Sequence, residues 1–132
     1  MITKDNYVLC FIILLIVTIV FPILAFAENW SQWRGPFFNG STTEKNLPIN
    51  WSKTENVLWV VKMPGPGFST PIIYEDKVFV TALDSATNKL LAICIDRKSG
   101  NELWKYEVAD GLENRNGNNG AVPSPVTDGK SV

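Results

Sequence analysis

Beyond Val57, short apolar runs alternate with turn-forming segments, and no apolar spacing of helical period interrupts this pattern. Such alternation is typical of antiparallel strands joined by tight turns. We therefore expect an all-β fold. The expected strands span residues 57–62, 71–74, 77–82, 89–95 and 102–108.

The connections between these runs are short and carry turn-forming residues. Glu75 and Asp76 form a two-residue polar hairpin turn, and residues 83–88 supply Asp, Ser, Thr and Asn. Between the last two strands, Gly100 can adopt positive φ, and the Asp96 carboxylate can accept backbone N–H groups. Residues 71–108 are thus predicted to form a four-stranded antiparallel meander.

Two internal echoes indicate a repeat protein. Residues 70–78 align without gaps against residues 124–132, with a hydroxyl residue, Pro, a branched apolar residue, a turn and Val in the same order. A shorter echo pairs residues 56–59 with residues 101–104, because both segments have the sequence Asn-x-Leu-Trp. Because one meander cannot bury both of its faces alone, we expect neighbouring repeats, and the sequence looks incomplete at its C-terminal end.

The run from Cys94 to Trp104 resembles the tryptophan-docking motif of pyrroloquinoline-quinone-like β-propeller repeats, Ala-x-Asp-x-x-Thr-Gly-x-x-x-Trp. The positions that carry the resemblance are Asp96, Ser99 (in place of Thr), Gly100 and Trp104. The segments Trp30-Ser31-Gln32-Trp33-Arg34-Gly35-Pro36 and Gly65-Pro66-Gly67-Phe68-Ser69-Thr70-Pro71 resemble the opening of secreted bacterial proteins of this kind. The resemblance spans nearly all of residues 29–132.

The resemblance implies a β-propeller of four-stranded blades, in an eight-bladed or similar ring. Residues 57–132 would then be an N-terminal fragment of the ring, with about one full blade and parts of its neighbours. Residues 57–62 would close the last blade as its outer strand. Trp104 would pack between adjacent blades, with its indole N–H bonded to a neighbouring carbonyl. The absent neighbouring blades are the first expected partners.

The N-terminal segment, residues 1–27, has the pattern of a signal peptide. A polar start is followed by an apolar run, by Pro22, and by small residues at Ala25 and Ala27 in an A-x-A arrangement. Cleavage after Ala27 predicts a periplasmic or secreted protein with no stable membrane span. The alternative is an uncleaved anchor, since the apolar segment is just long enough to cross a bilayer. Residues 28–56 are predicted to form an irregular arm, with Trp30, Trp33 and Trp51 packed against the β core.

Composition limits the chemistry that the chain can perform. Twelve Lys and Arg residues nearly balance thirteen Asp and Glu residues, so no basic surface suggests a nucleic-acid partner. The chain contains no His, the commonest general base and metal ligand. Cys94 is expected to be a buried strand residue. No catalytic, cofactor-binding or metal-binding residue is predicted.

Three functions remain open. The first is a non-enzymatic binding or scaffold module of the periplasm or cell envelope, with envelope proteins or polysaccharide as possible partners. The second is a quinoprotein dehydrogenase, an oxidoreductase that would need pyrroloquinoline quinone and calcium. No adjacent Cys pair or spaced acidic cluster suggests such a site. The third is a carbohydrate-binding surface module that uses Trp30, Trp33, Phe37 and Phe38.

Overall fold

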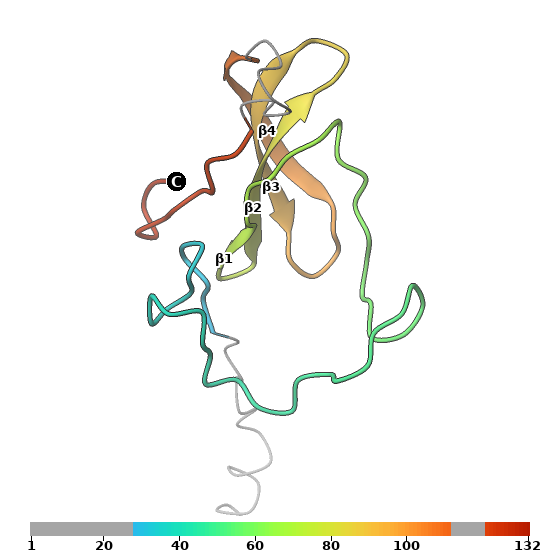
Figure 1. The fold of residues 1–132 in the computed structure, drawn as a ribbon, viewed down its shortest axis with the longest axis vertical. Helices are drawn as coiled ribbons and strands as arrows, with labels where there is room; N and C mark the ends of the chain where they lie inside the picture. The colour runs from blue at the N-terminus through green and yellow to red at the C-terminus, as the bar shows by residue number, and fades with distance from the viewer. Residues whose placement is uncertain (1–27, 112–120) are drawn as a thin grey trace, which may run out of the picture.

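The computed structural model describes residues 28–111 and 121–132. The expected signal peptide, with Ala25 and Ala27, lies outside the described residues. The fold is all-β and consists of one open four-stranded antiparallel sheet in the order β1-β2-β3-β4 (Figure 1). The strands are β1 (Ile72–Tyr74), β2 (Lys77–Asp84), β3 (Lys89–Asp96) and β4 (Glu102–Asp110).

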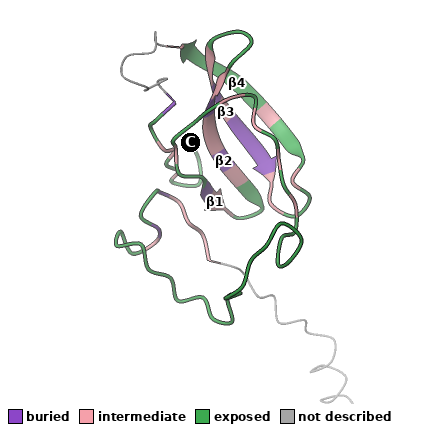
Figure 2. Cartoon of the chain, turned by 45° about the vertical axis from the view of Figure 1, so that its right-hand side comes forward, coloured by how far each residue is buried: buried purple, intermediate pink, exposed green. Residues whose placement is uncertain are grey.

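The strands follow each other in the chain as they do in the sheet, so the predicted meander is confirmed. The two-residue hairpin is also present, since Tyr74 pairs with Lys77 across Glu75 and Asp76. β3 is the most buried strand, and β4 is largely exposed (Figure 2). The pairing of β3 with β4 shifts register at two places, between Leu90 and Leu91 and between Cys94 and Ile95.

Alternating side chains give the sheet two apolar faces. On the first face, four buried residues form a cluster, namely Ala82, Leu91, Ile93 and Ile95. On the second face, Ile72, Phe79 and Cys94 are buried, with Tyr74 and Trp104 packed against them. Both faces of this sheet therefore need cover from elsewhere in the chain.

Residues 57–62 were expected to be a strand, and the structure assigns them none. The pairing expected for them is with the last blade of the ring, and it stays a prediction. The segment belongs to no strand of the sheet. It runs along the first face, where Trp59, Val61 and Met63 pack on the buried cluster. The intervening Leu58 and Val60 point outward and are 79% and 82% exposed. The period of two in the sequence thus reflects packing on a sheet face, which the pattern alone cannot distinguish from membership of the sheet.

The arm at residues 28–56 attaches to the sheet through its beginning. The backbone of Trp30 bonds to that of Ile73 in both directions, at 2.7 and 2.9 Å, which adds an isolated bridge to the free edge of β1. Trp30 is half-buried, as expected. The expectation failed for Trp33 and Trp51, which are 61% and 68% exposed. Arg34 lies over the Trp33 ring, 5.4 Å from its centroid.

Within the two described ranges, no helix has the length and apolar character needed to cross a membrane.

Candidate functional site

Three of the predicted motif residues meet in the turn between β3 and β4. The Asp96 carboxylate accepts hydrogen bonds from the Lys98 amide at 3.1 Å, the Ser99 amide at 2.7 Å and the Ser99 hydroxyl at 2.7 Å. The Gly100 amide closes the turn on the Asp96 carbonyl at 2.9 Å. Hydrogen bonds from Ser99, first from its hydroxyl and then from its amide, lower the pKa of Asp96.

A tryptophan from a distant segment rests on this turn. Gly100 has a φ of 75°, and a Cβ added there would lie 2.8 Å from the Trp59 ring. The Trp59 indole N–H donates to the Arg97 carbonyl at 2.9 Å. Only glycine fits this position, because the backbone is left-handed and the ring occupies the space of a side chain. The turn and Trp59 therefore form a built docking site for an indole ring.

Trp104, the motif tryptophan, lies elsewhere. It is half-buried on β4, 5.9 Å from the Phe79 ring and 5.2 Å from the Tyr106 ring, between centroids. It packs beside Cys94, which is fully buried on the second face. Burial raises the pKa of the Cys94 thiol, so this residue is a packing residue with little thiolate character.

The structure contains a second turn of the same construction, which sequence reasoning treated only as a run of turn formers. The Asp84 carboxylate accepts from the Ala86 amide at 2.8 Å, and the Asn88 amide closes on the Asp84 carbonyl at 2.8 Å. Asn88 has a φ of 55° and takes the place that Gly100 has in the other turn. The sequence contained the pattern that predicts this turn. Asp84, Thr87 and Asn88 have the same spacing as Asp96, Ser99 and Gly100.

The docking role of Trp59 was also missed. The sequence had linked Trp59 to Trp104 through the Asn-x-x-Trp echo, and it assigned the docking role to Trp104 alone. Because Trp59 corresponds to Trp104 in the repeated segment, the same docking role could have been predicted for Trp59.

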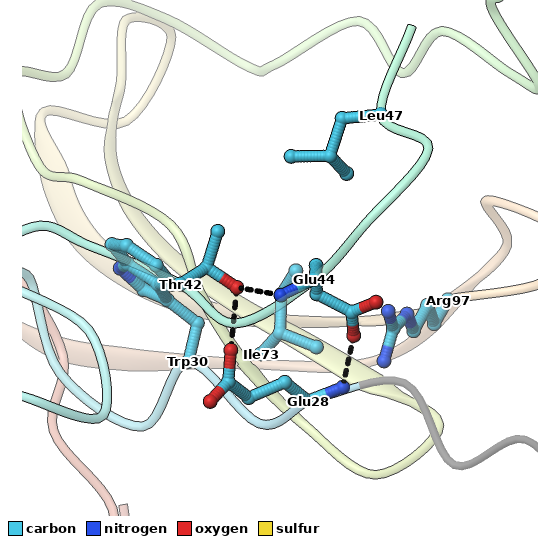
Figure 3. Close-up of a pocket in the computed structure, with 7 residues that line it drawn as sticks. All are labelled: Glu28, Trp30, Thr42, Glu44, Leu47, Ile73 and Arg97. Atoms are coloured by element: carbon cyan, nitrogen blue, oxygen red, sulfur yellow. Dashed lines mark hydrogen bonds between the residues drawn. The ribbon is translucent and has the colours of Figure 1, made fainter.

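A shallow hollow lies between the arm and the β1 edge (Figure 3). Its volume is about 320 Å³, and it is lined by Glu28, Trp30, Thr42, Glu44, Leu47, Ile73 and Arg97. Its polar groups are mostly engaged with each other. The Glu28 carboxylate accepts from the Thr42 hydroxyl at 2.5 Å, and the Glu28 amide donates to the Glu44 carboxylate at 2.6 Å.

Among the residues that the structure describes, no group of three or more Cys, Asp or Glu side chains is placed to hold a metal ion. No family model, curated protein or solved structure was found to match the chain. The fold and the site therefore define the class only as an all-β protein with one open, blade-like antiparallel sheet, on which a tryptophan docks against a glycine turn.

Proposed function

We propose that the chain is part of an exported β-propeller of the pyrroloquinoline-quinone-like type, and that it serves as a non-enzymatic binding or scaffold module in the periplasm or cell envelope. The observation that carries this proposal is the indole of Trp59 on Gly100 with its N–H on the Arg97 carbonyl. It joins a segment outside the sheet to a turn of the sheet, as stacked blades require.

The remaining surface supports the same proposal. Leu58 and Val60 carry apolar side chains away from the sheet, and Tyr106 and Val108 on β4 are also exposed. Exposed apolar positions along an outer strand and a covering segment are what a blade presents to its neighbours. Trp104 is the echo of Trp59 in the sequence, and we propose that it docks on the corresponding turn of the next repeat.

A quinoprotein dehydrogenase is the alternative enzyme, and a titration separates it from the scaffold. The full-length product of the gene is titrated with pyrroloquinoline quinone in the presence of calcium, and the quinone absorbance is followed. We expect no saturable spectral shift, because the Asp96 carboxylate is hydrogen-bonded within its turn and Cys94 is buried. A saturable shift at micromolar quinone would overturn the proposal and assign the enzyme.

A carbohydrate-binding module is favoured by one observation, the exposure of three aromatic residues in the arm. Trp33, Phe37 and Phe38 all present their rings to solvent, and sugar rings stack on such faces. Retention of the full-length protein on immobilised envelope polysaccharide tests this. Loss of retention in Trp33→Ala, with retention kept in Trp51→Ala, would establish the module, since Trp51 is equally exposed.

A further inference from the structure

The main-chain nitrogen of Glu28 is held by a carboxylate. It donates a hydrogen bond to Oε1 of Glu44 at 2.6 Å (Figure 3). An exposed peptide N–H normally bonds to water, and a charged side chain from sixteen residues further along the chain is an uncommon partner for it. The contact is therefore a specific feature of this arm.

The position of Glu28 is fixed from several sides. Its carboxylate Oε2 accepts hydrogen bonds from the Thr42 hydroxyl and, at 3.3 Å, from the Thr43 amide. The Thr42 hydroxyl in turn accepts from the Glu44 amide at 3.0 Å. The following residues are tied to the sheet, since the Asn29 side chain accepts from the Glu75 amide at 2.6 Å. The Glu28 nitrogen is thus held close to the Glu44 carboxylate.

We propose that Glu44 is a binding site for the α-ammonium group that is created when the chain is cleaved between Ala27 and Glu28. This inference rests on the proposed export of the protein. Cleavage adds water across that peptide bond, with the hydroxyl going to the Ala27 carbonyl carbon. The products are a carboxylate on Ala27 and an ammonium on Glu28. The neutral N–H donor becomes a cation with three donors, already within hydrogen-bond distance of Glu44.

The charges around the nitrogen favour this pairing. The hollow is lined by two carboxylates, those of Glu28 and Glu44, and by one guanidinium, that of Arg97. A new ammonium balances these charges, whereas the uncleaved chain leaves one carboxylate in excess. An ammonium also forms a shorter and stronger hydrogen bond to a carboxylate than an amide does. Processing would therefore fasten the start of the arm to Glu44, further along the same arm.

The test uses the full-length protein isolated after export from its host cell. Mass spectrometry of the N-terminal peptide first identifies the terminal residue, and we expect Glu28. The rate at which the α-amine reacts with acetic anhydride near neutral pH is then measured for wild type, for Glu44→Gln and for the control Glu55→Gln. Glu55 is an exposed carboxylate of the same arm.

We expect the α-amine to react about two- to fivefold more slowly in wild type and in Glu55→Gln than in Glu44→Gln, because an exposed ion pair stabilises the unreactive ammonium by that factor. Equal rates in all three proteins would overturn the ammonium site while leaving the export intact. A terminus other than Glu28 would overturn both the site and the proposed cleavage. Circular dichroism of the three proteins checks that the substitutions leave the sheet unchanged.

Discussion

At the scale of single residues, the glycine at the docking site is the position where substitution does most damage. Gly100→Ala forces a left-handed alanine and places its Cβ against Trp59. We expect a loss of about 2–4 kcal/mol in the free energy of unfolding, from backbone strain and from displacement of the ring. Urea unfolding followed by tryptophan fluorescence measures it.

Gly40→Ala is the matched control for this substitution. Gly40 has a φ of 83°, but a Cβ there meets nothing within 4 Å. Its cost is therefore backbone strain alone, about 1 kcal/mol. If the two variants were equally stable, the Trp59 ring would contribute nothing to the requirement for glycine.

The hydrogen bonds among Asp96, Ser99 and Gly100 could be predicted from the sequence, because they are local. Asp96, Ser99 and Gly100 lie within five residues, and each acts on the backbone of the others. The ring that covers Gly100 could not be predicted in the same way. Trp59 is about forty residues away, and its contact depends on how a separate segment crosses the sheet.

At the scale of elements, residues 57–63 have the sequence pattern of a strand, but they pack across a face of the sheet. Their alternation indicated which residues face inward, and Trp59, Val61 and Met63 do pack on the sheet. Pairing is a separate property, since it needs a neighbouring backbone with free N–H and C=O groups at the correct spacing. The four strands of the meander were predicted correctly because each is joined to the next by a short turn that brings its partner alongside.

The anchoring of this segment can be tested through Trp59. Trp59→Ala removes a half-buried ring from the first face and the indole bond to Arg97. We expect a loss of about 2–3 kcal/mol, below the range for a fully buried Trp because part of the ring is exposed. The unfolding midpoint in urea measures the loss.

Trp51→Ala is the control at this scale. The ring of Trp51 is exposed, so its removal should change the free energy of unfolding by less than about 0.5 kcal/mol. A large loss in this variant would mean that the arm packs in solution in a way that buries Trp51. A loss of under about 1 kcal/mol for Trp59→Ala would show that residues 57–63 detach from the sheet.

At the scale of the whole molecule, segments outside the four strands contact the sheet from both sides. Residues 57–63 lie on one side. On the other side, the Thr81 hydroxyl donates to the Pro123 carbonyl at 3.0 Å, and the Phe68 amide donates to the Ala121 carbonyl at 2.9 Å. The Thr127 amide also reaches the Ser31 carbonyl of the arm at 3.0 Å. These segments and the arm thus all contact the sheet or one another.

The carboxylates that close the turns contribute to the response of the whole fold to acid. Backbone N–H groups lower the pKa of Asp84 and of Asp128 from its ordinary value of 3.8, and the Ser99 hydroxyl, followed by backbone N–H groups, lowers that of Asp96. Each therefore adds stability that is present above pH 3.8 and is lost as the pH falls through the lowered pKa. Because the chain has no His, no imidazole titrates at intermediate pH.

We therefore expect the unfolding midpoint in urea to hold nearly constant from about pH 7 to about pH 5 and to fall below about pH 4. The double variant Asp84→Asn/Asp96→Asn keeps a carbonyl oxygen at each turn but removes the charge. It should be less stable than wild type at neutral pH, and the difference should shrink as the wild-type carboxylates become protonated. If the stability difference between the two proteins stayed constant down to about pH 2, the charge of these carboxylates would not contribute to it. The acid sensitivity would then arise elsewhere in the molecule.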